Sequence, residues 1–406
     1  MLASHLVCSG AAEHSRDASP SQPLKVMIVC SGLGHVSRGF ETFSQECFEA
    51  LRGHPELNVT LVKGAGAAVE GERVVRTINR ETWIARALGR AFRRSGYFAE
   101  QMVFAIRCLP LIRAERPDVV YFSDWALGRA LGRSRPIMGA RFRLLLSNGA
   151  AGPPPYDRTT DHVQQLTPVF FELGRDQSEW AQRQTLLPLG LAVPPVAERP
   201  DAAEVRALRR HLELPEEGTL VLSVAALNAW SKRLDHLIRE LAGVQPRPHL
   251  VLLGESEEET PVVLDLASSL LGDEGFTVRK VPPMAVGEYY RAADAFVLCS
   301  LYEGQGRALL EALAHGAPAI AHDAHWARYA TGGHAHLVDM TVEGSLRDEL
   351  GDALRAARDA DATRSAQRFV ADEFGWEALT PRYVEMLRTC AAVPPRMRRR
   401  GAKVDD

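Results

Sequence analysis

The chain has 406 residues, of which 46% are hydrophobic and 24% are charged, and its formal net charge at pH 7 is −3. This length exceeds one ordinary hydrophobic core and predicts two α/β domains. The weak negative charge excludes a nucleic-acid-binding protein with a basic surface, and no apolar run of the sequence reaches the roughly 20 residues that span a bilayer.

Strands and helices alternate from the start of the chain. Residues 1–24 lack a basic segment followed by an apolar core, so we expect a disordered extension there and not a secretory signal. The apolar run KVMIVC predicts a buried parallel strand over residues 25–30, and apolar side chains at helical spacing predict a helix over residues 40–51. A strand over residues 57–63, helices over residues 80–94 and 95–115, and a strand–helix–strand unit ending at Asn148 follow.

A proline-rich segment, residues 188–200, separates this alternation from a second one and is the expected hinge. The later runs TLVLSVA, HLVLLGE, FTVRKV, AFVLCS and APAIAHD predict strands with helices between them, which indicates parallel α/β layers. The expected domains are therefore residues 25–190 and residues 191–375. An amphipathic helix over residues 376–391 and a disordered basic tail over residues 392–406 complete the chain.

The six cysteines form no CxxC pair, and two of them lie in apolar strand-like runs. This usage favours a reducing cytoplasm over a disulfide framework. The high content of alanine and arginine indicates a bacterial genome rich in G and C.

The segment SLYEGQGRALLEALAHGAPAIAHD, residues 300–323, is the most informative motif. It predicts a strand, a loop with Glu303 and two glycines, and a helix that begins at Arg307. The carboxyl end of the strand directs the loop into the crevice between the domains, where open α/β sheets bind ligands. The amide groups at the start of the helix suit a diphosphate, and the carboxylate of Glu311 suits a ribose diol. The alternative is a helix with two solvated glutamates.

This segment resembles the retaining family 4 (group 1) glycosyltransferases, whose usual string is close to EGFGLALLEAMACGLPVVA, and the resemblance covers residues 25 to about 387. It implies the GT-B fold, in which two Rossmann-like domains face a cleft and a C-terminal helix returns to the N-terminal domain. It also implies donor-binding residues, and Gln305 stands where the family often has an aromatic residue. The implied sugar contacts are Glu303, Gly304, Gln305 and Gly306, the phosphate contacts are Arg307, Ala308 and Leu309, and the ribose contact is Glu311.

A second motif, LSVAALNAWSKRLDHLIREL, places Lys232 near the start of a helix. A lysine there neutralises a diphosphate leaving group. Family members usually have an arginine where this chain has Ala226, and Arg233 is the expected substitute. The alternative is a surface Lys-Arg pair at a helix start, where the helix dipole disfavours positive charge. Asn228, Val281 and Gly34 complete the predicted donor-binding set.

The predicted acceptor side consists of three segments. The loop SGLGHVSRGFETF is not a GxGxxG fingerprint, but it resembles the first glycine-rich loop of the family. It offers Arg38 as an acceptor contact, and His35 as both an acceptor contact and a general base. Asp124 ends a strand and is a candidate sugar contact or helix N-cap. Asn148, Tyr156 and His162 belong to a proline-rich connection that is either an acceptor loop or a solvated connector.

Together these motifs predict a glycosyltransferase that moves a sugar from a nucleotide-diphosphate sugar, with UDP favoured by the resemblance, to an acceptor hydroxyl. The resemblance implies retention of configuration, and no cofactor or metal is expected. His322, Asp323 and His325 lack the spacing of zinc ligands, and His322 and Asp323 are expected to line the cleft. Asp359 and Asp361 are expected on a charged helix. The predicted catalytic residues are Glu303, Lys232, His35 and Asp124.

Two other functions are compatible with the sequence. The residues Ala226 and Ser123, which stand where the family has an arginine and a histidine, are also compatible with a protein that binds a nucleotide-sugar without transferring it. The second alternative function is that of a nucleotide-sugar epimerase with the same fold. The expected partners are the donor and the acceptor, without nucleic acid. The short basic tail leaves peripheral contact with anionic lipid open, and the sequence does not give the oligomeric state.

Overall fold

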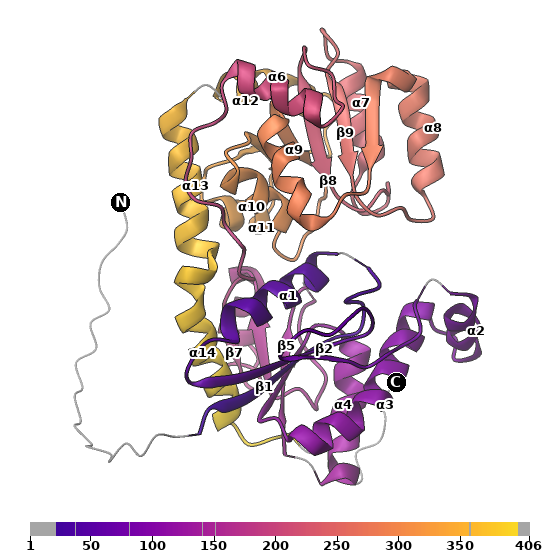
Figure 1. Ribbon diagram of the computed structural model, residues 1–406, viewed down its shortest axis with the longest axis vertical. Coiled ribbons are helices and arrows are strands. Elements are labelled where there is room, and N and C mark those ends of the chain that lie inside the picture. Colours follow the sequence, from indigo (N-terminus) through magenta and orange to yellow (C-terminus); the bar gives the residue numbers. More distant parts are fainter. Residues whose placement is uncertain are drawn as a thin grey trace, which may run out of the picture.

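The computed structural model describes residues 22–36, 38–80, 82–139, 141–150, 152–356 and 359–396. Most of the predicted disordered extension and the end of the predicted basic tail lie outside the described residues. The chain forms two α/β domains, drawn one above the other in Figure 1. Each domain is built around a parallel sheet, as the alternation of strands and helices predicts.

The N-terminal sheet has the strand order β3-β2-β1-β4-β5-β6-β7 within the described part of the chain. Neighbouring strands pair in parallel, and the central strands are buried along their length, which is typical of a sheet covered by helices on both faces. Its strands are β1 (Leu24–Cys30), β2 (Leu57–Lys63), β3 (Glu72–Val74), β4 (Val119–Phe122), β5 (Arg143–Ser147), β6 (His162–Gln165) and β7 (Gln184–Leu186).

The C-terminal sheet has the order β10-β9-β8-β11-β12-β13, again with parallel pairing. In each sheet the strand order reverses beside the first strand of the domain, between β1 and β4 and between β8 and β11. Such a reversal creates the switch point where α/β sheets bind ligands. The strands are β8 (Leu220–Val224), β9 (His249–Leu253), β10 (Phe276–Arg279), β11 (Ala295–Leu298), β12 (Ala319–His322) and β13 (His336–Val338).

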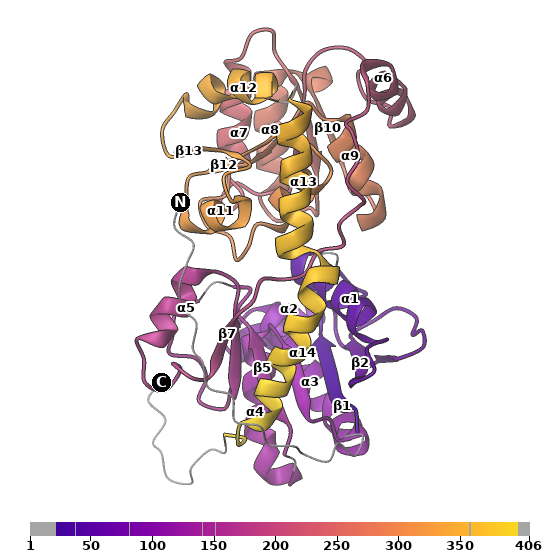
Figure 2. The ribbon, with the colours of Figure 1, turned by 90° about the vertical axis from the view of Figure 1, so that its left-hand side faces the viewer.

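Helices cover both sheets (Figures 1 and 2). In the N-terminal domain they are α1 (Gly39–Leu51), α2 (Trp83–Ala91), α3 (Gly96–Glu115), α4 (Trp125–Met138) and α5 (Pro168–Arg175). In the C-terminal domain they are α6 (Ala202–His211), α7 (Leu234–Ala242), α8 (Thr260–Leu271), α9 (Val286–Ala292), α10 (Arg307–Ala314), α11 (His325–Thr331), α12 (Ser345–Ala356) and α13 (Ala360–Phe374), followed by α14 (Trp376–Ala392). No described helix is both long and apolar enough to cross a membrane.

Three sequence expectations about local structure need correction. The proline-rich connection after Asn148 contains strand β6, which is buried although two of its four residues are glutamines, because Gln164 and Gln165 are hydrogen-bonded. Asp359 is not inside a charged helix: it is the N-cap of α13, and its carboxylate accepts hydrogen bonds from the amides of Asp361 and Ala362. The first residues of the predicted disordered tail contact the N-terminal domain, where the Arg396 guanidinium pairs with Glu179.

Helices α13 and α14 link the two domains along one side of the molecule (Figure 2). Gly375 separates them, and at this break the Leu191 amide donates to the Phe374 carbonyl at 2.8 Å. Helix α14 then packs on the N-terminal domain, where the Trp376 and Phe43 rings stack with centroids 5.8 Å apart. The expected return of the C-terminal helix to the N-terminal domain is therefore confirmed.

The hydroxyl of Tyr383 fastens α14 to the segment that leaves the N-terminal domain. It donates to the Pro188 carbonyl at 2.8 Å and accepts from the Gln164 amide at 2.9 Å, and all three groups are buried. Tyr383→Phe removes this hydroxyl and leaves buried partners less well satisfied, so we expect the free energy of unfolding to fall by about 1–2 kcal/mol. Chemical denaturation measures the change, with Tyr329→Phe in the C-terminal domain as the control. Equal stability of both variants would contradict this role.

Candidate functional site

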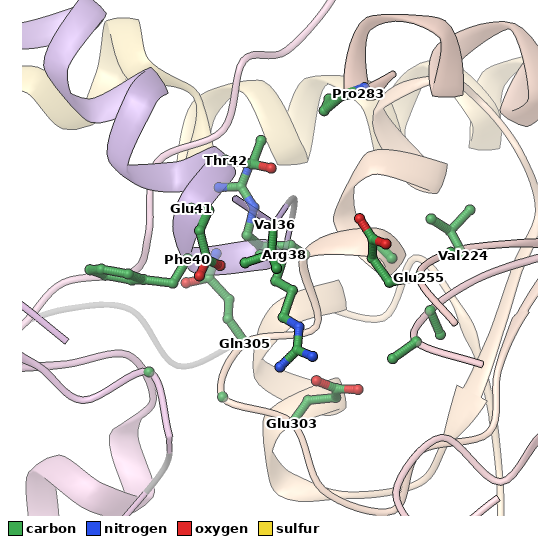
Figure 3. Close-up of a pocket in the computed structure, with 18 of the residues that line it drawn as sticks. Val36, Arg38, Phe40, Glu41, Thr42, Val224, Glu255, Pro283, Glu303 and Gln305 are labelled. Carbon is green, nitrogen blue, oxygen red and sulfur yellow. The ribbon is translucent and has the colours of Figure 1, made fainter. Parts of the chain in front are cut away.

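A cavity of about 1550 Å³ lies between the two domains. Loops that follow the carboxyl ends of strands line it from both sides, which is the expected position for a ligand site in open α/β sheets. Figure 3 shows Glu41 and Arg38 on the N-terminal wall and Glu303 on the C-terminal wall. Of the predicted donor-binding residues, the cavity lining includes Asn228, Lys232, Val281, Glu303, Gly304, Gln305, Gly306, Arg307, Ala308 and Glu311.

The loop between β11 and α10 forms the centre of the C-terminal wall. Gly306 has φ +75°, a left-handed conformation that suits glycine, and it ends the loop directly before α10 begins at Arg307. A Cβ atom on Gly304 would lie 2.2 Å from the Gly149 carbonyl oxygen, so the two domains approach each other here through backbone. The amides of Arg307 and Ala308 have no carbonyl partner within the helix and lie beside the cavity, whereas the Leu309 amide donates to the Gly306 carbonyl at 2.9 Å.

Lys232 forms an ion pair with Glu303 of this loop, with Nζ 2.5 Å from Oε1. The turn that carries Lys232 is shaped by Asn228, whose side-chain oxygen accepts from the amides of Ser231 and Lys232 at 3.1 and 2.9 Å. Glu259 holds the same turn by accepting from the amides of Ala229 and Trp230. Asn228 therefore lines the cavity and also orients the lysine.

Arg233 was expected to take the place of the arginine that Ala226 replaces, and this expectation is wrong. Its backbone is left-handed with φ +52°, and its guanidinium donates to the Met340 carbonyl at 2.5 Å. Arg233 is not part of the cavity lining, whereas Ala226 is. The side chains of these two neighbours therefore have different partners, Glu303 for Lys232 and the Met340 carbonyl for Arg233.

Glu311 lies in the second turn of α10 and points into the cavity. The Tyr290 hydroxyl is 3.1 Å from Oε2 of Glu311, and the Arg307 guanidinium is 3.7 Å from Oε1. Burial raises the pKa of Glu311, and the nearby Arg307 opposes that shift. The side chain keeps 27% of its surface accessible, so a ligand in the cavity can reach the carboxylate.

Gln305 and Arg307 line the cavity with part of their surface, but their polar groups serve the contact between the domains. The Gln305 side chain accepts from the Leu189 amide at 2.5 Å and donates to the Leu189 carbonyl at 2.9 Å. The Arg307 guanidinium donates to the Gly190 carbonyl at 2.7 Å and pairs with Glu46 at 2.9 Å. The side chains predicted near sugar and phosphate are therefore engaged elsewhere, which leaves the amides of this segment for a ligand.

The N-terminal wall contains a polar cluster around Asp124, formed by Ser31, Glu41, Arg80, Tyr97, Glu100 and Asp124. Asp124 precedes α4 but makes no capping bond, because its carboxylate accepts from the hydroxyls of Tyr97 and Ser31. Burial raises the pKa of Asp124, and the hydrogen bond from Tyr97 opposes the shift. The N-cap alternative is thus correct for the position of Asp124 and wrong for its side chain.

Arg80 is the guanidinium of this cluster. Two of its nitrogens donate to the two oxygens of Glu100 at 3.0 and 2.7 Å, and Glu41 lies 3.6 Å away. No motif in the sequence points to Arg80, Glu100 and Tyr97, which come from α3 and from the segment before α2. A carboxylate at an otherwise apolar helical position, Glu100, is the signal that was available.

Several residues predicted on the acceptor side or beside it lie away from the cavity. Asn148 is buried and hydrogen-bonded to Gly152 and Gln165, Tyr156 is buried against Trp180, and His162 is buried beside Thr185. His322 accepts from the Met340 amide and Asp323 pairs with Arg328, so neither lines the cleft. Gly34, His35 and Leu309 are also absent from the lining that the structure describes.

Arg38, by contrast, lies at the cavity and spans it. Its guanidinium pairs with Glu257 of the C-terminal domain at 3.2 Å. Among the residues that the structure describes, no group of three His, Cys, Asp or Glu side chains lies close enough to hold a metal ion.

His162 makes folding sensitive to pH. Burial lowers the pKa of its imidazole from 6.5 to about 4, and its Nδ1 has no partner among the described atoms. The unfolded chain therefore binds more protons between pH 6.5 and 4, and the stabilising effect of the neutral ring is lost as the pH falls through that range. We expect His162→Gln to remove roughly 3 kcal/mol of the decrease in unfolding free energy between pH 7 and pH 4.

Chemical denaturation at a series of pH values measures this slope. His325→Gln, which changes an exposed histidine, is the matched control and should keep the slope of the unmodified chain. A His162→Gln variant with that same slope would contradict the assignment.

Comparison with known proteins agrees with the geometry. Residues 204–350 match the family model described as glycosyl transferases group 1. TuaC of Bacillus subtilis (strain 168), a glycosyltransferase assigned to teichuronic acid biosynthesis, is 30% identical over 38% of this chain and 37% of its own length. The D-inositol 3-phosphate glycosyltransferase of Xylanimonas cellulosilytica is 31% identical over 45% of each chain. This chain therefore spans less than half the length of these curated relatives.

The structural similarity to known proteins covers more of the chain than the sequence similarity does. The solved structure of sucrose-phosphate synthase from Thermosynechococcus elongatus superposes with a TM-score of 0.72 at 18% identity, covering 90% of this chain and 98% of that one. The predicted two-domain α/β architecture is therefore confirmed. In the sequence of its C-terminal domain and in its GT-B fold, this chain resembles the group 1 glycosyltransferases.

Proposed function

We propose that this chain is a glycosyltransferase that moves a sugar from a nucleotide-diphosphate sugar to an acceptor hydroxyl. One observation carries the proposal: Lys232, Glu303 and the first amides of α10 meet on one wall of a cavity between two domains. A lysine and helix amides suit the diphosphate, and a carboxylate suits the hydroxyls of the sugar. The group 1 sequence match over the same domain supports the assignment.

In this proposal the diphosphate lies against the start of α10. Negative charge develops on the leaving phosphate as the bond between C1 of the sugar and the phosphate oxygen breaks. The fixed amides and the lysine stabilise that charge. Lys232 exchanges its contact with Glu303 for the phosphate, which frees Glu303 to accept hydrogen bonds from the sugar. Because the positive charge comes from the chain itself, the proposal includes no metal and no further cofactor.

The ribose hydroxyls are assigned to Glu311, which faces the cavity from the second turn of α10. Uracil is the proposed base, and the resemblance is its support. Val281 lines the same side of the cavity and is assigned to the base.

The acceptor is assigned to the N-terminal wall, where Asp124 and Glu41 line the cavity. Asp124 orients the acceptor by accepting a hydrogen bond from a second hydroxyl of the acceptor, so the proton of the attacking hydroxyl stays available for transfer. The acceptor oxygen bonds to C1 on the face that the phosphate leaves, and the hydroxyl proton passes to the leaving phosphate oxygen. This course retains the configuration at C1, as the family resemblance implies, and needs no nucleophilic carboxylate.

The proposed setting is the cytoplasm of a bacterium. The cysteines that the structure describes, Cys30, Cys47, Cys108, Cys299 and Cys390, are free and buried, and this supports a reducing compartment.

Lys232→Ala and Glu311→Ala test the donor wall. We expect Lys232→Ala to lower kcat/KM by about 10²-fold or more, because it removes a charge that stabilises the leaving group. Glu311→Ala should weaken donor binding by about 10- to 100-fold, the loss of hydrogen bonds to a charged group. A thermal-shift screen with UDP, ADP, GDP and dTDP first identifies the donor base, since a ligand that binds the native state raises Tm. Lys25→Ala, an exposed lysine outside the cavity, is the control, and wild-type turnover by both site variants would refute the proposal.

Asp124→Asn tests the acceptor wall. The amide keeps the size of the side chain but accepts a weaker hydrogen bond, so we expect kcat of transfer to fall about tenfold or more while the affinity for the nucleotide diphosphate is unchanged. Steady-state kinetics and calorimetry with the nucleotide separate the two effects. Loss of nucleotide affinity in Asp124→Asn would contradict its assignment to the acceptor side.

A second candidate is a protein that binds a nucleotide-sugar without transferring it. It is favoured by Ala226, which lines the cavity where family members usually have an arginine. Product analysis distinguishes the candidates: donor binding without any transferred, hydrolysed or epimerised sugar supports binding alone, and an epimerised sugar without acceptor supports the epimerase.

A further inference from the structure

Helix α2 and its connection to α3 project from the edge of the N-terminal domain, at the right of Figure 1. We call residues 82–98 the α2 hairpin; it comprises α2, the connecting residues and the first turn of α3. Within α2 only Ala85 and Gly89 are buried, and they face α3. The rest of the helix is exposed in the structure, although its composition is largely apolar.

The exposed side chains of this hairpin include large apolar groups. Trp83 is 77% exposed, Phe92 66%, Ile84 44% and Leu88 40%. Ile84, Leu88 and Phe92 follow one another at intervals of four residues, so they share one face of the helix. Single exposed apolar side chains are ordinary on protein surfaces, but a contiguous set on one helix marks an interaction site.

This exposure is built into the fold. Thr82 and Ser95 cap α2 and α3 by accepting from the amides of Ala85 and Phe98. A Cβ atom on Gly89 would lie 2.4 Å from the Ser95 carbonyl oxygen, and one on Gly96 would lie 2.5 Å from the Arg80 carbonyl oxygen. Two glycines therefore allow the backbone of the hairpin to pack tightly, and this packing holds the apolar face outward.

The same segment is strongly basic. Residues 82–98 contain Arg86, Arg90, Arg93 and Arg94 and no aspartate or glutamate, in a chain whose net charge is −3. All four arginines are exposed. The hairpin thus combines aromatic and aliphatic side chains with a local positive charge, which is the composition of helices that lie in the surface of an anionic bilayer.

We propose that the α2 hairpin docks on a membrane surface that contains anionic lipid, with Trp83, Ile84, Leu88 and Phe92 in the interface and the arginines beside the headgroups. A nucleic acid would use the arginines but leave the aliphatic face exposed to water. A second copy of the chain, paired by two-fold symmetry through this face, would bring the arginines of both copies together. An anionic lipid surface satisfies the apolar groups and the charges at once.

The docking surface is continuous with the cavity. Arg94, Ser95, Tyr97 and Phe98 of the hairpin line it on the N-terminal wall. Docking therefore brings the proposed acceptor side of the cavity next to the lipid surface. The inference goes beyond the proposed sugar transfer and is independent of it, since binding to lipid is measured without donor or acceptor.

Cosedimentation of the full chain with phosphatidylcholine vesicles, with and without phosphatidylglycerol, tests the proposal. We expect binding to the phosphatidylglycerol vesicles that weakens at high salt, and little binding to pure phosphatidylcholine. The double variants W83A/F92A and R90E/R93E should each lower the partition coefficient about tenfold or more. The control V262A/R206E changes an exposed valine and an exposed arginine of the C-terminal domain and should bind as the unmodified chain does.

Thermal unfolding verifies that the variants stay folded, and a blue shift of the tryptophan emission that Trp83→Phe abolishes reports insertion of that ring. Three results would overturn the proposal: binding that does not depend on anionic lipid, hairpin variants that bind like the control, or sedimentation in solution showing a dimer that W83A/F92A dissociates. Retention on single-stranded DNA that R90E/R93E abolishes, without vesicle binding, would assign the surface to nucleic acid instead.

Discussion

The contact between the start of α10 and the chain segment that joins the domains governs the rest of the site. The Gln305 side chain satisfies both the amide and the carbonyl of Leu189, and Arg307 holds the next carbonyl and Glu46. Buried polar backbone groups must be paired, so this segment cannot shift without leaving several of them unsatisfied. The loop with Glu303 therefore has a fixed position relative to the N-terminal domain, even though it belongs to the other domain.

Helix α14 reinforces the same junction from the other side. Oε1 of Glu46 pairs with Arg307, whereas Oε2 accepts from the Ala192 amide at 3.1 Å and lies 3.4 Å from the indole nitrogen of Trp376. A Cβ atom on Gly190 would lie 2.5 Å from the Trp376 ring. The segment that joins the domains therefore passes α14 too closely for any side chain at this position. Linker, α1, α10 and α14 thus meet at one point beside the cavity.

The two walls of the cavity differ in chemistry. The C-terminal wall offers a lysine, helix amides and the carboxylates of Glu303 and Glu311, which suit the proposed donor with its diphosphate and sugar. The N-terminal wall gathers three carboxylates, Glu41, Glu100 and Asp124, around one guanidinium of Arg80, and burial raises the pKa of Glu41 and Asp124. Such a wall accepts hydrogen bonds and suits hydroxyl groups better than phosphates. Arg38 and Glu257 connect the walls across the cleft.

The sequence by itself determined the parallel α/β architecture and the loop and helix that carry Glu303 and Glu311, because apolar strands, their spacing and the string around these two residues are local properties. It did not reveal β6, whose glutamines are buried by partners distant in sequence, and it therefore assigned Asn148, Tyr156 and His162 to a surface loop.

Only the tertiary structure decided which side chains face the cavity. Arg233 precedes α7 directly but turns toward Met340, while Arg80, Tyr97 and Glu100 join Asp124 although no motif unites them. The direction in which a side chain points depends on the backbone dihedrals, and its hydrogen-bond partners depend on residues that folding brings near. The spacing of residues within one segment determines neither of these.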